Sequence, residues 1–289
     1  MNDFLLSIVL GIVEGLTEFL PVSSTGHLRI VEALFKLNLQ DSFWKMYTIV
    51  IQLGAILALP VYFWKRILEF LSTFPKGERG DRNFLTHPLS LTIVAFVVTA
   101  LPSWALTKVI GKNLESLWVI SIALLVGGIV MWIVDAVCTR VRVTDMEEMS
   151  LPQAIWIGAC QILSAVFPGT SRSMSTIAAG QIVGLSRPAA LEFSFFLSMP
   201  TMVVATLYDL YKTLKPSRNT IDEGNLAPLA VDAHQWVVLT IGFVVSFIVA
   251  LFVVAWFMRW VRTKGFVPFA IYRIVLAIVL IILLMRGSI

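Results

Sequence analysis

Six long apolar runs constrain the fold of this chain more than any other feature of its sequence. Each run is long enough to cross a hydrocarbon core of about 30 Å as a helix. The runs occupy residues 44–63, 88–108, 117–137, 189–211, 235–258 and 266–285. A backbone surrounded by lipid must satisfy its own hydrogen bonds, and the runs lack the alternating pattern of barrel strands. The sequence therefore predicts an all-α polytopic membrane protein with six transmembrane helices.

The composition agrees with the lipid bilayer as the environment of this chain. Of its 289 residues, 58% are hydrophobic and 14% are charged, far from the balance of a soluble domain. The net charge of +4 comes from residues spread over short loops, so we expect no nucleic-acid partner. Cys138 and Cys160 lack the spacing of a metal site, and neither a metal site nor a disulfide is expected of them.

Two further segments, residues 4–34 and 152–187, are apolar but interrupted by a proline and small polar residues. Because proline disfavours a helical conformation in the residue before it, the first helix of each segment should stop near Leu20 or Phe167. Each stop leaves a helix of about fifteen residues, too short to cross the membrane. Irregular backbone at membrane depth needs protein or a water-filled cavity around it. The pattern predicts two re-entrant helical hairpins whose tips meet near the membrane centre.

The two interrupted segments match each other without a gap when one is shifted by 147 positions. The matched pairs are Gly11 with Gly158, Glu14 with Gln161, Thr17 with Ser164, Pro21 with Pro168, and Ser24 with Ser171. Such a match indicates a duplicated unit. We expect a single integral-membrane domain, 1–289, with internal repeats at about 1–137 and 148–289. One hairpin and three spans per repeat give an odd number of crossings, which predicts inverted topology.

The basic residues of the loops predict the orientation. Loops 64–87, 138–150 and 259–265 would share one side and carry ten Lys and Arg, against eight on the side of both termini. Cytoplasmic loops are enriched in Lys and Arg, so these loops should lie in the cytoplasm and the termini outside it.

Glu14 and Glu18 are four residues apart, so they share one face of a helix inside an apolar segment. A single carboxylate at the bilayer centre costs about 2.5 to 3.5 kcal/mol on insertion scales, and two side by side cost more. A divalent cation, an arginine or a shared proton would each offset that cost. The alternative is a solvated helix near the surface.

Ser23, Ser24, Thr25 and Gly26 follow the first break and precede His27. Small residues at the start of a helix expose backbone N–H groups and hydroxyls, and the helix dipole favours an anion there, such as a phosphate. Ordinary capping by a serine uses the same groups. The histidine is a candidate for proton transfer, with a plain packing role as the alternative.

The second break adds a fixed positive charge. Its residues are Pro168, Gly169, Thr170, Ser171, Arg172 and Ser173, with Thr176 one turn further on. The planar guanidinium of Arg172 suits two oxygens of one phosphate, and a structural salt bridge to Glu14 or Glu18 is the competing interpretation. Together the two breaks would supply a hydroxyl, carboxylates, an imidazole and a guanidinium, the groups that phosphoryl transfer requires.

The stretch Glu14–His27, which reads EGLTEFLPVSSTGH, resembles the signature of the BacA-type undecaprenyl-diphosphate phosphatases. The motif PGTSRS at 168–173 is similar to the second motif of that family. The resemblance extends to IQLG at 51–54, EFSF at 192–195 and PFAIYR at 268–273, and so covers nearly the whole chain. The polar loop at 212–234 is less family-like.

The resemblance implies hydrolysis of undecaprenyl pyrophosphate to undecaprenyl phosphate and inorganic phosphate in the bacterial inner (cytoplasmic) membrane. This reaction recycles the carrier lipid for peptidoglycan synthesis and confers bacitracin resistance. The resemblance also implies that Glu14 and Glu18 hold a divalent cation, Mg²⁺ or Ca²⁺, that Ser24 is the nucleophile, that His27 transfers protons and that Arg172 binds phosphate. The substrate-binding residues would be Ser23, Thr25, Gly26, Gly169, Thr170, Ser171, Ser173 and Thr176.

Several alternatives stay open at the level of sequence. A water on the metal could replace Ser24 as the nucleophile. Broken helices in inverted repeats are also a transporter design, so a flippase for the lipid carrier is the rival function. A type 2 phosphatidic-acid phosphatase is disfavoured, because no His and Asp follow Ser171 and Arg172 at the spacing of that family. A homo-oligomer is a candidate assembly.

Overall fold

A computed structural model describes residues 2–35, 37, 42–78, 80–110, 116–214 and 232–286, and these form helices joined by turns and loops. Six of the helices are long and apolar enough to cross a membrane. They are α3 (Ser42–Tyr62), α5 (Pro88–Ile110), α6 (Leu117–Val137), α9 (Arg187–Leu214), α10 (Ala233–Trp260) and α11 (Val267–Met285). The predicted all-α class is confirmed, and six helices have the length and apolar character of the six predicted spans.

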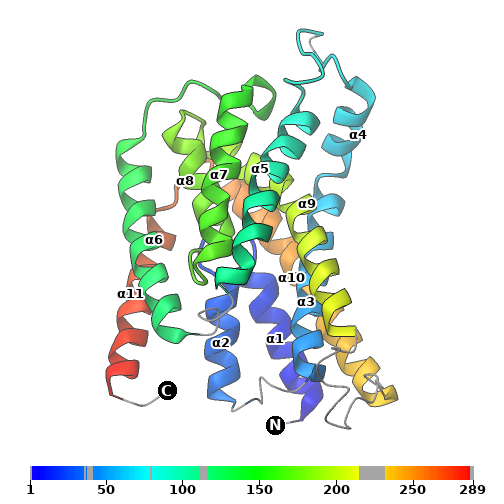
Figure 1. Cartoon of the computed structure of the whole chain (residues 1–289), viewed down its shortest axis with the longest axis vertical. Coiled ribbons are helices and arrows are strands. Elements are labelled where there is room, and N and C mark those ends of the chain that lie inside the picture. Colours follow the sequence, from blue (N-terminus) through cyan, green and yellow to red (C-terminus); the bar gives the residue numbers. More distant parts are fainter. Residues whose placement is uncertain are drawn as a thin grey trace.

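Two pairs of shorter helices lie among the long ones. The first pair is α1 (Asp3–Thr17) and α2 (Ser24–Leu34), and the second is α7 (Leu151–Val166) and α8 (Arg172–Ile182). The first pair reaches from the end of the molecule that holds both termini to its middle, and the second pair reaches inward from the opposite end (Figure 1). Both breaks occur close to the stops that the prolines predict, and they face each other at mid-height.

Each short pair packs on a long helix from the other half of the chain. Helix α1 lies along α10, and α7 lies along α5. A Cβ atom added at Gly11 would approach the carbonyl oxygen of Gly242 to 2.9 Å, and one added at Gly158 would approach the Cα of Ala95 to 2.9 Å. Both pairs of contacting residues are related by the same shift of 147 positions. Glycine at these two positions lets the helix backbones approach closely.

The helices α2 and α8 begin in the same unusual way. Ser23 and Ser171, their capping residues, have φ of 73° and 68°, a left-handed conformation that is uncommon for serine. The Oγ of each serine accepts a hydrogen bond of 3.4 Å from a backbone N–H three residues on, in Gly26 and Met174 respectively. These bonds satisfy one backbone donor at the start of each helix.

This geometry corrects the alignment of the two breaks. The gap-free match pairs Ser24 with Ser171, but the shared cap conformation pairs Ser23 with Ser171. The second break has one more residue between its proline and its cap, so the match is wrong by one residue beyond the proline. Ser24 therefore corresponds to Arg172, and each is the first residue of its helix.

The segment 64–87, expected to be a loop, contains the helix α4 (Trp64–Thr73). Its length is too short for a span, and it buries one face through Phe70. A short 3-10 helix, η1 (Met146–Glu148), lies nearby, and Arg66 of α4 forms ion pairs with Asp145 at 2.9 Å and Glu147 at 3.2 Å. These contacts fix α4 at the end of the molecule opposite the termini (Figure 1).

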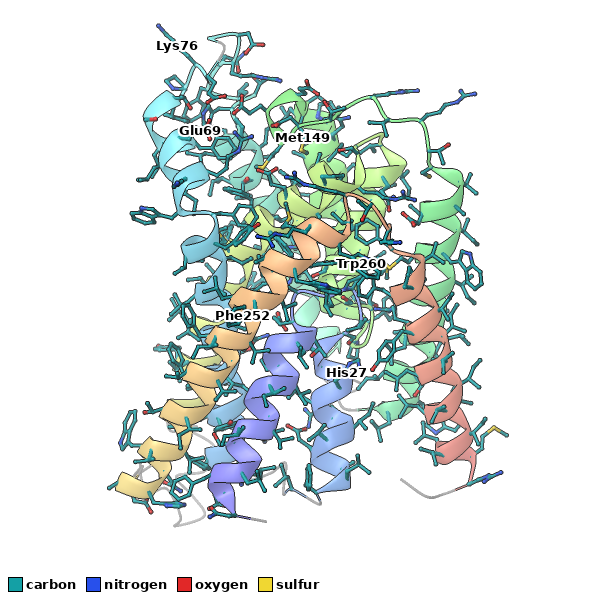
Figure 2. All side chains as sticks on the ribbon, turned by 180° about the vertical axis from the view of Figure 1, so that it is seen from behind. His27, Glu69, Lys76, Met149, Phe252 and Trp260 are labelled. Carbon is teal, nitrogen blue, oxygen red and sulfur yellow. The ribbon has the colours of Figure 1, made fainter. Side chains whose placement is uncertain are left out.

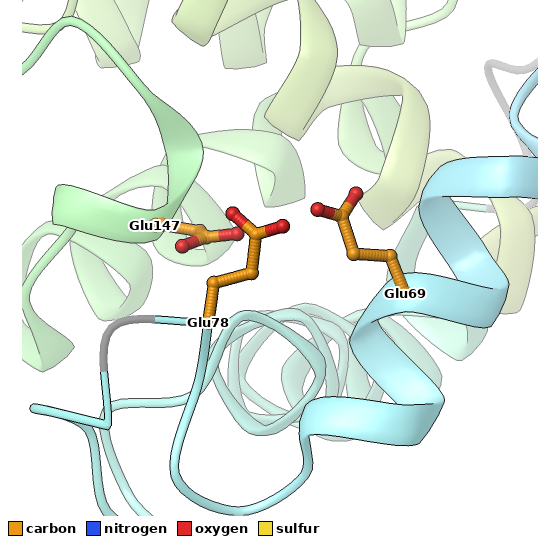
Figure 3. A group of neighbouring side chains, drawn as sticks. All are labelled: Glu69, Glu78 and Glu147. Atoms are coloured by element: carbon orange, nitrogen blue, oxygen red, sulfur yellow. The ribbon is translucent and has the colours of Figure 1, made fainter.

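Three carboxylates, those of Glu69, Glu78 and Glu147, gather at that end, with one oxygen of each within 4.8 Å of the others (Figure 3). A hydrogen bond between Glu69 and Glu78 lowers the pKa of Glu69 and raises that of Glu78. Arg66 also pairs with Glu69 at 3.1 Å, so the group is partly neutralised by protein. This acidic cluster lies far from the two breaks (Figure 2).

A candidate active site between the two short helix pairs

Glu18, just beyond the end of α1, joins the two breaks. Its side chain is buried, and its two oxygens have different partners. Oε2 accepts a hydrogen bond from the hydroxyl of Ser24, and Oε1 accepts one from Nη2 of Arg172. One carboxylate therefore contacts the first residue of α2 and the first residue of α8. The structure brings the acidic and the basic break together, as the sequence predicts, and the competing salt bridge of Arg172 is present.

Buried polar atoms without partners flank this ion pair. Glu14 is 1% exposed, and neither of its carboxylate oxygens has a hydrogen-bond partner among the described residues. The Nε of Arg172 is also buried without a partner there. Buried polar atoms without partners are costly, so such atoms indicate ligands that bind next to them. The acidic side suits a cation, and the free N–H of the guanidinium suits an anion.

The residues present fit a divalent cation. Hard cations take oxygen ligands, and Glu14 offers two carboxylate oxygens whose polar neighbour is the carboxyl group of Glu18 and to which no basic group bonds. Glu18 is one helical turn away on the same face, although both its oxygens have protein partners. Glu14 and Glu18, the predicted cation ligands, therefore lie side by side. Glu14 is the residue whose oxygens have no hydrogen-bond donor from a basic group or a hydroxyl.

Two polar cavities adjoin at this centre. One, of about 240 Å³, has Glu18 and Arg172 in its wall, and the other, of about 220 Å³, has Glu14. Ser24, Thr25 and Gln52 line both cavities, so the cavities meet at these side chains. Of the other predicted residues, Ser23, Gly169 and Ser171 line the first cavity. The ion pair therefore lies at the wall of two neighbouring cavities that share polar lining residues.

Several lining residues were missed by sequence reasoning. They are Gln52, Ser164 and Thr201 in the first cavity, and Arg29, Glu32, Lys45 and Asp209 in the second. The sequence contained a signal for Gln52. A primary amide in the middle of an apolar span is costly to bury, and polar residues kept at such positions usually have a function. The serine and threonine carried none, since hydroxyls in helices commonly bond to their own backbone.

His27 lies beside the centre but lines neither cavity. Its Nδ1 is 2.7 Å from the carbonyl oxygen of Ser23, and its Nε2 is 2.6 Å from the hydroxyl of Tyr272. The rings of His27 and Tyr272 are stacked, with their centroids 5.6 Å apart. Nε2 therefore ties the start of α2 to α11, whereas Nδ1 bonds to the capping residue of α2 itself.

Four other predicted residues also lie outside the two cavities. Thr176 bonds to the hydroxyl of Ser194 at 2.6 Å, and its Oγ1 donates to the carbonyl of Arg172 at 2.9 Å. Gly26 and Ser173 are buried within their helices. Thr170 lines a separate apolar groove between α6 and α8. These residues shape the two breaks without contacting the shared space.

The fold and the site together define a class of protein. The chain is a multi-pass helical membrane protein with a charged centre inside it, built from two short helix pairs. A sequence model of the family described as "Bacitracin resistance protein BacA" matches residues 7–279. The chain belongs to the BacA family.

Curated relatives match over almost their whole length. An undecaprenyl-diphosphatase of Koribacter versatilis is 65% identical, over 96% of this chain and 97% of the relative. One from Caldanaerobacter subterraneus is 39% identical, over 98% of this chain and 97% of the relative. One from a Bradyrhizobium species is 40% identical over the full length of both chains.

Proposed function

We propose that this chain is an undecaprenyl-diphosphatase, which hydrolyses undecaprenyl diphosphate to undecaprenyl phosphate and inorganic phosphate. The observation that carries the proposal is the buried Glu18, which binds Ser24 from one break and Arg172 from the other at the edge of a polar cavity. The relatives that match along the whole chain bear the name of this activity. Bacitracin resistance and recycling of the carrier lipid for peptidoglycan synthesis follow from the same reaction.

Ser24 is the nucleophile in this proposal. Its hydroxyl donates to Glu18, so the carboxylate can take the proton while Oγ attacks the terminal phosphorus. The new Oγ–P bond replaces the bond to the bridging oxygen, and undecaprenyl phosphate leaves with that oxygen. Water then attacks the phosphoserine, releases inorganic phosphate and restores the serine. If Ser24→Ala keeps near-normal turnover at saturating lipid, water attacks directly and Ser24 only binds.

Arg172 and the backbone of the breaks bind the diphosphate. The guanidinium has a free buried Nε–H in addition to the group that bonds Glu18. Ser23, Thr25, Gly169 and Ser171 line the same space, where the N-termini of α2 and α8 favour an anion. Charge-assisted bonds of this kind position a phosphate and stabilise its transition state. His27, Gly26, Thr170, Ser173 and Thr176 support this site through the contacts described above.

A divalent cation, Mg²⁺ or Ca²⁺, completes the site in this proposal. Glu14 would hold it together with Glu18, which is supported by the two unpartnered oxygens of Glu14. When bound between these carboxylates, the cation would supply positive charge that offsets the negative charge of the diphosphate.

The architecture in this proposal is an inverted repeat, 1–137 and 148–289, in the inner membrane of a bacterium, with each short helix pair forming a re-entrant hairpin. Reciprocal packing supports it, because α1 lies on α10 and α7 lies on α5. The shift of 147 positions that relates Gly11 to Gly158 also relates their contacts, Gly242 and Ala95, which favours a duplicated unit.

The deciding experiment is phosphate release from undecaprenyl diphosphate by the purified chain in detergent. Release is expected. Transport of the lipid across vesicle membranes without any release of phosphate would replace the phosphatase with a flippase.

A further inference from the structure

Arg273 of α11 has no role in the function proposed above, yet it is the largest side chain that the structure buries completely, at 0% exposure. It lies within an apolar span, where a cation is costly unless it is well bonded. All of its hydrogen bonds within the described residues go to backbone carbonyls, and none goes to a carboxylate. A cation kept there without an acid to neutralise it needs another explanation.

The three carbonyls belong to three separate segments. Nη1 donates to Pro21 at 3.1 Å, and Nη2 donates to Gly169 at 3.0 Å and to Ala123 at 3.2 Å. Pro21 lies in the first break between Glu18 and Ser24. Gly169 lies in the second break, and Ala123 lies in α6. One guanidinium therefore bridges both breaks and fixes them to a long helix.

The surrounding residues make room for this guanidinium. A Cβ atom at Gly127 of α6 would lie 3.2 Å from Cζ of Arg273, and one at Gly128 would lie 3.1 Å from its Cβ. A larger residue at Gly127 would displace the guanidinium, and one at Gly128 would push α11 away from α6, because its Cβ would also lie 3.0 Å from the backbone oxygen of Ala270. The second break is itself pressed against α6, because a Cβ at Gly169 would lie 2.9 Å from the Cα of Ile120. The bridge thus depends on close approach of α6, α11 and the second break.

We infer that Arg273 is a positioning residue: it holds the two breaks at the separation at which Glu18 and Arg172 share one centre. This inference rests on the proposed function only for its kinetic consequence. The planar fork of an arginine presents several donors in fixed directions, whereas a lysine has one nitrogen and cannot reach three segments in the same geometry. Arg273→Lys therefore keeps the charge and removes the bridge.

The first test measures the effect of the bridge on backbone exchange and needs no activity assay. Hydrogen–deuterium exchange of the detergent-solubilised protein is compared among wild type, Arg273→Lys and the control Arg187→Lys. Arg187 is a matched control because it also bonds a neighbouring segment, through Asp135, but away from the breaks. We expect faster exchange in peptides 18–27 and 167–176 together in Arg273→Lys, and in neither of them in the control. Unchanged exchange in either break of Arg273→Lys overturns the inference.

The second test is kinetic. A displacement of about 1 Å at a reacting centre can lower a rate about 100-fold, so kcat should fall strongly in Arg273→Lys while KM changes little. In an Arg172→Lys background, the same substitution should lower kcat far less. The phosphate-binding guanidinium of Arg172, which Arg273 positions, is already missing there. A purely stabilising role would lower activity by the same factor in both backgrounds and would refute the inference. Wild type without phosphate release refutes the proposed function instead, and the exchange result still decides the role of Arg273.

Discussion

At the scale of single residues, the centre is defined by Glu18, which accepts hydrogen bonds from Ser24 and Arg172 at the same time. A carboxylate in this position can act as a base toward the serine and orient the arginine. Glu14 has a different environment one turn earlier, because no protein donor occupies its oxygens. We therefore expect different effects from replacing Glu18 and from replacing Glu14.

Replacing Glu18 with glutamine removes the base and the charge that pairs with Arg172. We expect phosphate release to fall by about 10² to 10⁴ for loss of a positioned base. The matched control is Glu69→Gln, since Glu69 also pairs with an arginine, Arg66 at 3.1 Å, but at the far end of the molecule. Steady-state release from undecaprenyl diphosphate measures both variants, and equal losses in the two would contradict the assignment.

Glu14 should determine the response to a divalent cation. Adding Mg²⁺ or Ca²⁺ to chelator-treated wild type should restore activity and raise the melting temperature, because a ligand that binds the folded state stabilises it. Glu14→Gln should lose most of that increase. In chelator the variant should be at least as stable as wild type, because it no longer buries an unpaired carboxylate. A cation-induced increase that is the same in both proteins would exclude Glu14 as a ligand.

At the scale of helices, the site depends on how closely α7 and α5 pack, because α7 carries the second break. The contact is made at Gly158, against the backbone of Ala95. Similar close packing at Gly11 holds α1 on α10. Each break is therefore placed by a glycine contact about two turns away from it.

Gly158→Val should force α7 away from α5. Overpacking of this kind costs about 1 to 3 kcal/mol, so the melting temperature and phosphate release should both fall. Ile155→Val is the control, because Ile155 lies on the same helix and is 41% exposed. Thermal unfolding in detergent compares the Gly158→Val and Ile155→Val proteins. Equal melting temperatures would show that α7 and α5 can move apart without loss of stability.

His87, directly before α5, predicts sensitivity to acid. It is buried, and its Nδ1 accepts a hydrogen bond from the backbone N–H of Leu89 at 3.2 Å. Burial lowers the pKa of His87, so the folded state binds fewer protons than the unfolded state. Its stabilising effect is therefore complete above about pH 6.5, the ordinary histidine value, and is lost as the pH falls toward the folded-state pKa.

His87→Asn keeps an acceptor for that N–H and cannot titrate. Melting temperatures measured from pH 7 down to pH 5 should fall less in this variant than in wild type. Parallel curves for the two proteins would show that His87 does not contribute to the pH dependence.

At the scale of the whole molecule, the loops that join the spans decide which face is cytoplasmic. The segment 64–87, which contains α4, and the segment 138–150 lie at the end opposite both termini (Figure 1). The second polar cavity is lined by Lys45 near the start of α3, so we expect the site to open toward the face of the termini.

Cysteine labelling tests this orientation. In a background with Cys138 and Cys160 replaced by alanine, Lys76→Cys should resist a membrane-impermeant reagent in intact cells and react after permeabilisation. His234→Cys, near the other end and 48% exposed, should react in intact cells. The reverse pattern would invert the topology.

The sequence by itself determined the six spans, the two breaks and the identity of most residues in the centre. These depend on local properties: the length of an apolar run, the effect of proline on its neighbour, and the cost of a charge in lipid. The family resemblance added the reaction. The helix α4 escaped detection because it is short and amphipathic rather than uniformly apolar.

Only the tertiary structure decided which atoms meet. It paired Ser23 rather than Ser24 with Ser171, placed His27 against Tyr272, added Gln52 to the site and joined both breaks through Arg273. Each of these depends on how helices far apart in the sequence rotate and pack against one another. Apolar length and proline position do not encode that rotation, since many rotations bury the same apolar surface.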